Sequence, residues 1–249
     1  MKTQYFFVLF LFIINKSYSQ FNEIKNFQKQ IIENEITGSN TAMIYKDGKT
    51  LFYNIENSGK KGDKNISNQS YKPNLETIFP IWSMSKPITI VAMMILRERG
   101  MISINDNLSK YIPEFKNMTC KGEKGKYPCK KEIKIIHLLT HRSGFGYYSD
   151  QGYGYGFTNT LTYNNLKDFA EDLSKVELEF EPGEKYYYGL NQALLGRVVE
   201  IVSKKSFYDF LKDEIFDPLK MTETKFYLTE NDRSRFQPLF INTGELKGF

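Results

Sequence analysis

The chain has 249 residues, of which 41% are hydrophobic and 25% are charged, and its formal net charge is +5. This length and apolar content suffice for one sizeable core or for two interlocked subdomains. The positive charge is modest and no basic stripe follows a helical face, so we expect no nucleic-acid partner. The two histidines and two cysteines are too few to predict a metal centre, and we expect no cofactor.

The N-terminus has the layout of a secretory signal peptide. Lys2 is followed by an apolar run over residues 5–14 and then by a polar stretch that ends at Ser19. Such a run is short for crossing a bilayer. We therefore expect residues 1–19 to be removed and the protein to be secreted or periplasmic, with an uncleaved anchor as the alternative. We expect no transmembrane segment after removal of the signal.

A helix and a hairpin are expected next. Four apolar residues recur at helical spacing and predict an amphipathic helix: Ile24, Phe27, Ile31 and Ile36. Asp47-Gly48 stands between two strand-like runs, which predicts a β-hairpin over residues 41–53. Residues 54–72 are rich in Gly, Asn, Ser and Lys and read as a surface connection.

The most informative stretch contains Ser83 and Lys86. Three residues along a helix are nearly one turn, so the two side chains are expected on one face, within reach of each other. A lysine whose pKa is lowered by burial can take the proton of a serine and turn it into a nucleophile. Alternatively, Ser83 is only a helix N-cap and Lys86 is a solvated lysine.

The residues after Lys86 favour the catalytic interpretation. Pro87 fits only the first turn of a helix. The positions that follow are apolar on nearly all sides: Ile88, Ile90, Val91, Met94, Ile95 and Leu96. We therefore expect a nucleophile helix over residues 83–99 that stops at Gly100, with Lys86 in a dry setting rather than at the surface.

A cysteine pair and a histidine pair follow. Cys120 and Cys129 bracket a Lys- and Gly-rich loop, and in an exported protein we expect a disulfide between them. His137 and His141 lie four residues apart near an expected helix end. Two histidines alone make an incomplete metal site, and Lys86 already offers a base. We therefore interpret both histidines as structural.

Residues 147–157 alternate tyrosine and glycine. One interpretation is a flexible surface loop. The other is an aromatic rim over a pocket, in which Tyr147 and Tyr148 contact the substrate. The sequence leaves both open.

Residues 181–191 form the second informative stretch, with a Pro-Gly turn and three consecutive tyrosines. They lead into a helical pattern with five apolar residues on one face: Leu194, Leu195, Val198, Val199 and Val202. A short helix over residues 207–216 is expected after it, capped by Ser206 and ended by Asp217-Pro218.

Five segments in this order resemble the class C β-lactamase-related serine hydrolases, a family that also contains D-alanyl peptidases and esterases. They are Ser83–Thr89, His137–Gly144, Pro182-Gly183 with the tyrosines after it, Leu195–Glu200 and Phe216–Thr222. The resemblance covers about residues 21–236. It implies the serine β-lactamase-like, penicillin-binding-protein-like fold, which combines an α/β part with an all-α subdomain, the latter at about residues 105–236.

The resemblance also implies the site. Ser83 would be the acylated nucleophile and Lys86 its partner. Tyr188, six residues after Pro182, would pass the proton to the leaving group, with Tyr187 as the alternative. A phenolate beside an ammonium such as that of Lys86 is stabilised enough to act as a base. The implied substrates are small-molecule esters, amides or β-lactams, with peptidoglycan peptides among the candidates.

Two departures from the family pattern matter. The β-lactamases and peptidases carry a substrate-holding asparagine two residues after the tyrosine, whereas this chain has Leu190, which makes Leu190 a candidate substrate contact and points to the esterase-like members. The family's third motif, Lys or His followed by Thr or Ser and Gly, supplies half of the oxyanion hole, and Asn242-Thr243-Gly244 is not that motif. We therefore expect residues 20–249 to form a partial domain that lacks the last strands and the closing helix.

Three functions stay open. Ser83, Lys86 and Tyr188 favour a serine hydrolase that forms an acyl-enzyme, with a preference for esters. The missing third motif favours a catalytically impaired pseudoenzyme that uses the same pocket. Composition alone supports an exported cell-wall-binding module that uses the Tyr/Gly loop.

Overall fold

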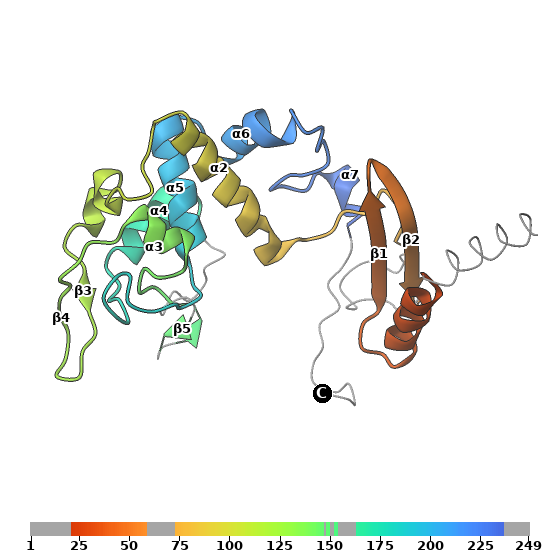
Figure 1. Ribbon diagram of the computed structural model, residues 1–249, viewed down its shortest axis with the longest axis horizontal. Coiled ribbons are helices and arrows are strands. Elements are labelled where there is room, and N and C mark those ends of the chain that lie inside the picture. Colours follow the sequence, from red (N-terminus) through yellow and green to blue (C-terminus); the bar gives the residue numbers. More distant parts are fainter. Residues whose placement is uncertain (1–20, 59–72, 147, 150–151, 154–162, 237–249) are drawn as a thin grey trace, which may run out of the picture. The chain divides into compact units, whose positions relative to one another are not determined.

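The computed structural model describes residues 21–58, 73–146, 148–149, 152–153 and 163–236 (Figure 1). The chain divides into two compact units, which we treat separately. The described residues up to Pro80 together with those over 227–236 form the hairpin unit, and the described residues of Ile81–Phe226 form the helical unit. The expected signal peptide, Tyr147 and Asn242-Thr243-Gly244 lie outside the described residues.

The hairpin unit is built on β1 (Ser39–Lys46) and β2 (Lys49–Asn57), which pair antiparallel. Asp47 and Gly48 between them both have positive φ, at 51° and 74°, as a type I′ turn requires. The pairing register shifts between Ile44 and Tyr45. The expected hairpin is present, and each strand extends beyond the 41–53 range.

Residues 21–33 are helical and are bound to the hairpin by a buried amide. The Gln28 side chain donates to Asn40 Oδ1 at 2.7 Å and accepts from Asn54 Nδ2 at 3.1 Å. Phe21 also stacks on Phe52, with ring centroids 5.2 Å apart. The short helix α7 (Glu230–Arg233) belongs to the same unit.

The helical unit has α5 (Asn191–Ser203) at its centre. This helix packs against α2 (Lys86–Glu98), α3 (Ile135–Leu139), α4 (Leu166–Leu173) and α6 (Phe207–Leu211) (Figure 1). Its apolar face is fully buried at Leu194, Leu195, Val198 and Val199, as the sequence pattern predicted. Two 3₁₀ turns, Leu108–Lys110 and Pro113–Phe115, follow α2.

The expected helix over residues 207–216 is present in two parts. Ser206 caps α6 by accepting the Asp209 N–H, and α6 continues into a π-helical turn over Lys212–Phe216. A bidentate ion pair between Arg99 and Glu214 fastens this turn to the end of α2. The described strands of this unit are two residues long: β3 (Thr119–Cys120), β4 (Tyr127–Pro128), β5 (Tyr148–Ser149) and β6 (Gly152–Tyr153).

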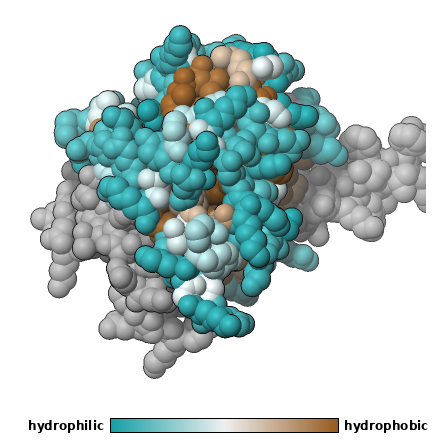
Figure 2. Space-filling model, turned by 90° about the vertical axis from the view of Figure 1, so that its left-hand side faces the viewer, coloured by the Kyte–Doolittle hydropathy of each residue, from teal (hydrophilic) through white to brown (hydrophobic). Residues whose placement is uncertain are grey.

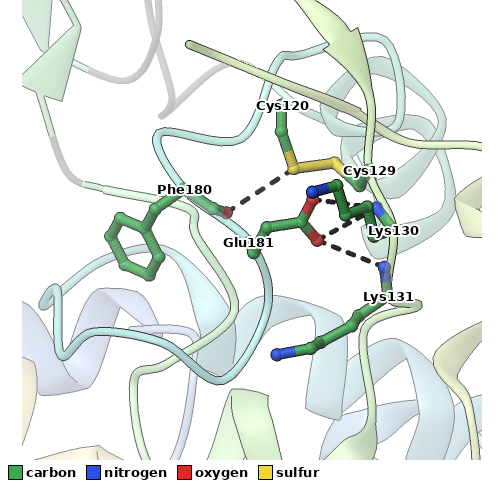
Figure 3. Close-up of a disulfide and its surroundings, with 6 residues drawn as sticks. All are labelled: Cys120, Cys129, Lys130, Lys131, Phe180 and Glu181. Atoms are coloured by element: carbon green, nitrogen blue, oxygen red, sulfur yellow. Dashed lines mark hydrogen bonds between the residues drawn. A yellow bond between two sulfur atoms is a disulfide. The ribbon is translucent and has the colours of Figure 1, made fainter.

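The expected disulfide joins Cys120 and Cys129 and closes the loop that carries β3 and β4. Figure 3 shows that this loop is also bound to the segment before the tyrosines. Cys120 Sγ lies 3.7 Å from the Phe180 carbonyl oxygen, and the buried Glu181 carboxylate accepts the backbone N–H groups of Lys130 and Lys131. The face of the unit on the β3–β4 side is mostly hydrophilic (Figure 2). Lys124 and Lys126 of this loop are exposed, whereas Lys121 is half-buried and forms an ion pair with Glu179.

The helix after Ser83 differs from expectation in two respects. A 3₁₀ turn, Trp82–Ser85, comes first, and the α-helix starts only at Lys86; it does end as expected, with Gly100 at φ 70°. In addition, α2 is buried on one side only. Met93 and Leu96 are 0% exposed, whereas Val91 is 47% exposed, because only one face of α2 packs against the other helices of this unit.

Candidate active site

Ser83 stands in the 3₁₀ turn and Lys86 is the first residue of α2. Lys86 Nζ donates a hydrogen bond to Ser83 Oγ at 2.9 Å, as their spacing predicted. The turn begins at Trp82, whose φ of 46° is uncommon for a residue other than glycine. Ser85, the other serine of the turn, is bonded to the backbone instead, through its Oγ to the Trp82 carbonyl oxygen at 2.7 Å.

Tyr188 completes a cluster of three polar side chains. Its hydroxyl lies 2.8 Å from Ser83 Oγ, and Lys86 Nζ lies 4.8 Å from the centre of its ring. Tyr187, the alternative tyrosine, packs its ring against Phe180 at 6.3 Å. The structure therefore brings Ser83, Lys86 and Tyr188 together, and it places Tyr188 rather than Tyr187 beside Ser83.

Lys86 lowers the pKa of the Tyr188 phenol. Burial raises the pKa of the Tyr188 phenol, but hydrogen bonds with Lys86 and Ser83 and the positive charge of Lys86 outweigh it, so the pKa falls below its ordinary value of 10.0. A lowered pKa favours the phenolate, which is the form that can accept a proton. The cluster thus places a hydroxyl beside a phenol whose pKa is lowered.

The cluster is more open than the sequence indicated. Ser83 is exposed and Lys86 is half-buried, so the expectation of a dry lysine is wrong for the described residues. Trp82 and Met84 on either side of Ser83 are 66% and 69% exposed. They give Ser83 an apolar border.

His141 and Asn191 are two site residues that the sequence interpretation missed. The His141 ring stacks on Tyr188, with centroids 4.7 Å apart and planes 26° from parallel. Its Nδ1 lies 2.9 Å from Asn191 Nδ2 and 3.3 Å from the Gly189 backbone nitrogen. Asn191 is fully buried, and its Oδ1 accepts from Ser143 Oγ.

The structure therefore separates the two histidines, which the sequence had grouped as structural. His137 Nδ1 accepts the Lys134 N–H at 3.2 Å, and its ring lies against Gly183. His141 instead contacts the tyrosine of the cluster. No local signal in the sequence distinguishes them, because the partners of His141 lie about 50 residues further along the chain.

The other candidate contacts are less defined. Leu190 is the N-cap residue of α5 and packs partly against the core, while the amide of the next residue, Asn191, is bound to His141 and Ser143. Tyr148 lies in β5, and Tyr147 lies outside the described residues. An aromatic rim formed by these two tyrosines stays a prediction.

The described residues contain no group of three or more His, Cys, Asp or Glu side chains placed to hold a metal ion. None of their helices is long and apolar enough to span a membrane.

Comparisons with known proteins place the chain in a family. The "Beta-lactamase" family model matches residues 26–243. Protein flp of Staphylococcus aureus (strain N315) is 30% identical over 220 residues, covering 88% of this chain and 40% of that protein. Esterase EstB of Burkholderia gladioli is 26% identical over 215 residues, covering 83% of this chain and 51% of that protein.

A solved structure has a similar fold. EstCE1, "a hydrolase with promiscuous acyltransferase activity", superposes with a TM-score of 0.71 at 23% identity, over 90% of this chain and 56% of that one. The chain thus spans about half the length of the relatives it matches. The resemblance inferred from the motifs is confirmed: this chain belongs to the β-lactamase family of serine hydrolases, which includes esterases, and it has the β-lactamase-like fold.

Proposed function

We propose that Ser83, Lys86 and Tyr188 are the catalytic group of an ester-cleaving serine hydrolase. One observation carries the proposal: Ser83 Oγ lies 2.9 Å from Lys86 Nζ and 2.8 Å from the Tyr188 hydroxyl. A serine within hydrogen-bond reach of a base, with that base held by a third group, is the arrangement of an activated nucleophile.

The reaction follows from these contacts. Ser83 Oγ attacks the ester carbonyl carbon while its proton passes to the Tyr188 phenolate, which the Lys86 ammonium stabilises. Collapse of the tetrahedral intermediate breaks the bond to the alcohol oxygen, and Tyr188 gives its proton to the departing alcohol. The acyl group is then on Ser83. Water attacks it, Tyr188 takes the water proton and returns it to Ser83, and the carboxylic acid leaves.

Esters suit the site better than amides or β-lactams. Leu190 stands where the peptidase and β-lactamase members hold the substrate amide, and the neighbouring Asn191 amide is already hydrogen-bonded. The names of EstB and EstCE1 support the same class, since one is an esterase and the other a hydrolase with acyltransferase activity. Loss of one hydrogen bond should cost amide-like substrates about 1 to 3 kcal/mol, or about one to two decades of rate.

This preference is measurable. We expect kcat/KM for short-chain aryl esters to exceed that for β-lactams by at least about 10- to 100-fold. The Leu190→Asn substitution should narrow this difference in kcat/KM. Equal kcat/KM values for esters and β-lactams in the native chain would contradict the ester preference.

We also propose that the enzyme works outside the cytoplasm. The signal-like residues 1–19 support this location, and so does the Cys120–Cys129 disulfide, because disulfides persist in oxidising compartments. Peptidoglycan peptides are therefore candidate substrates beside small esters. Detection of the chain, without its first 19 residues, outside the cytoplasm of the producing cell tests the location.

A fluorophosphonate probe tests the nucleophile. The native chain should be labelled and Ser83→Ala should not. Ser85→Ala is the matched control, because Ser85 lies in the same turn and its hydroxyl is bound to the backbone; this variant should be labelled normally. Labelling of Ser83→Ala would move the nucleophile elsewhere. Absence of labelling in the native chain would favour the pseudoenzyme.

A further inference from the structure

We propose that His141 is a positioning residue for Tyr188, and that it holds the phenol at Ser83 only while its imidazole is neutral. The inference rests on the proposed role of Tyr188 as the proton carrier. It assigns a function to a histidine that lies beside the reacting group without touching Ser83.

His141 supports the tyrosine segment, residues 185–189, which carries Tyr188. Residues 185–189 have neither helical nor strand structure, so regular backbone hydrogen bonds do not fix Tyr188. His141 supplies three contacts in their place. Its ring stacks on the Tyr188 ring, its Nδ1 faces the Gly189 N–H at 3.3 Å, and its carbonyl oxygen accepts the Tyr187 N–H at 2.8 Å.

His141 is itself held in place by its backbone conformation and by a hydrogen bond with Asn191. Its φ of 54° is left-handed, a conformation that persists only where the surroundings impose it. Asn191 Nδ2 lies 2.9 Å from Nδ1. The orientation of that amide is set because Asn191 Oδ1 accepts from Ser143 Oγ, and Ser143 Oγ in turn accepts the Phe145 N–H at 3.1 Å. A buried polar chain thus leads from the core to the imidazole.

The contacts of the His141 ring depend on its protonation state. A neutral imidazole with Nδ1 as acceptor carries its proton on Nε2, whereas an imidazolium has no acceptor. Protonation would therefore place an N–H at Nδ1 against two N–H donors, those of Gly189 and Asn191. Among the described residues, the titratable groups that face the His141 ring are Lys86 from α2 and Tyr186 and Tyr188 from the tyrosine segment. Burial and the charge of Lys86 lower the pKa of His141 below its usual 6.5, so the supporting form prevails at neutral pH.

Two substitutions separate the parts of this role. His141→Phe keeps a ring for stacking but has no acceptor. His141→Asn offers an oxygen near the Nδ1 position and suits a left-handed backbone, but it cannot titrate. His137→Asn is the matched control, because the chain has only two histidines and His137 is also half-buried with Nδ1 accepting an N–H.

Two readouts on the full chain test the proposal. One is the pH dependence of fluorophosphonate labelling at Ser83, and the other is the pKa of Tyr188 from NMR of ¹³C-labelled tyrosine, assigned with Tyr188→Phe. A displaced catalytic group costs on the order of 100-fold, so we expect His141→Phe to label about 10- to 100-fold more slowly and to show a raised Tyr188 pKa. In the native chain, labelling should fall as Tyr188 is protonated and should fall again below about pH 6.5, where His141 takes up a proton. His141→Asn should label within about 5-fold of the native rate and should lack this second fall. His137→Asn should match the native chain.

The opposite results are equally clear. Native-like labelling and an unchanged Tyr188 pKa in His141→Phe would overturn the proposal, and so would an equal loss in His137→Asn. If His141→Phe fails to fold, a fall in labelling below about pH 6.5 that persists unchanged in His141→Asn overturns it. A native chain that is not labelled contradicts the proposed function, while the Tyr188 pKa in the His141 variants still decides the role of His141.

Discussion

The two halves of the proposed site are held by different kinds of interaction. Ser83 and Lys86 stand at the start of α2, whose inner face is fixed by apolar packing: Ala92, Met93 and Leu96 are fully buried. Tyr188 stands on an irregular segment that hydrogen bonds hold in place. His141 and Arg142 supply them, the latter through its guanidinium to the Gly183 and Glu184 carbonyl oxygens.

The contrast predicts different weaknesses. Apolar packing is non-directional and insensitive to pH, so the Ser83 half should respond to lost volume and not to protonation. Hydrogen bonds are directional and depend on the protonation state of their partners. The Tyr188 half should therefore respond to small shifts of backbone and to acid. Substitutions in each half test this contrast.

The largest effect is expected for Tyr188→Phe. It removes the proton carrier without changing the ring, and general acid–base catalysis typically contributes 10²- to 10⁴-fold. We expect kcat/KM for an aryl ester to fall by about that factor. Tyr187→Phe is the control, because its ring packs on Phe180, and it should stay near the native value. The reverse ranking would assign the role to Tyr187.

Next comes Leu96→Ala, on the buried face of α2. Removing a large buried side chain costs about 2 to 5 kcal/mol of unfolding free energy, whereas Val91→Ala, at a position that is 47% exposed, should cost far less. Urea unfolding measures both. Well below the unfolding midpoint, labelling of Ser83 in Leu96→Ala should stay within a few-fold of native. A loss of stability as small as that of Val91→Ala would show that packing does not hold this half.

Gly189→Ala tests the Tyr188 half. A Cβ at position 189 would overlap the Phe145 carbonyl oxygen and lie 2.7 Å from the Gly146 carbonyl carbon, so the backbone beside Tyr188 must move. A displacement of about 1 Å can cost roughly 100-fold in rate, and we expect a loss of that order in kcat/KM. Unchanged activity would mean that this segment tolerates displacement.

The smallest effect concerns acid stability outside the site. Hydrogen bonds to Asp106 from Tyr111, the Ser103 N–H and Lys110 outweigh its desolvation and lower its pKa from 3.8 to about 2. A lowered carboxyl pKa stabilises the fold above about pH 4, and this stability is lost as the pH falls from about 4 to 2. We expect it to be on the order of 1 kcal/mol after solvent screening.

The experiment is urea unfolding of the native chain and of Asp106→Asn at pH 7 and near pH 3. Asp106→Asn should be less stable at pH 7, and the difference should shrink in acid. Because Asp106 stays ionised at pH 5, a loss of labelling at pH 5 is not caused by this group. A difference that grows in acid would contradict the assignment.

Much of the helical unit was predictable because its signals are local. The spacing of Ser83 and Lys86, the apolar face of α5, the Ser206 cap and the cysteine pair can each be recognised within a few residues of sequence. Tyr188 could be named only through resemblance to a family, because its contact with Ser83 joins residues 105 positions apart.

The rest depends on contacts that leave no pattern in the sequence. The link from His141 to Asn191 spans 50 residues, so spacing could not distinguish it from the local bond of His137. Gly189 is required because a neighbouring backbone passes close to it, which sequence does not show. The partial exposure of Lys86 was missed because the apolar run after it indicated burial on nearly all sides, while α2 is covered on one side only in the described unit.

The most direct test of the central claim is to trap the acyl-enzyme. The native chain would be mixed with a short-chain aryl ester, quenched in acid at early times and digested, and the peptide that contains Ser83 would be weighed by mass spectrometry. We predict that this peptide gains the mass of the acyl group in the native chain, and that the same adduct forms about 10²- to 10⁴-fold more slowly in Tyr188→Phe. Ester hydrolysis with the acyl group on another residue, or with no adduct in either chain, would contradict the account.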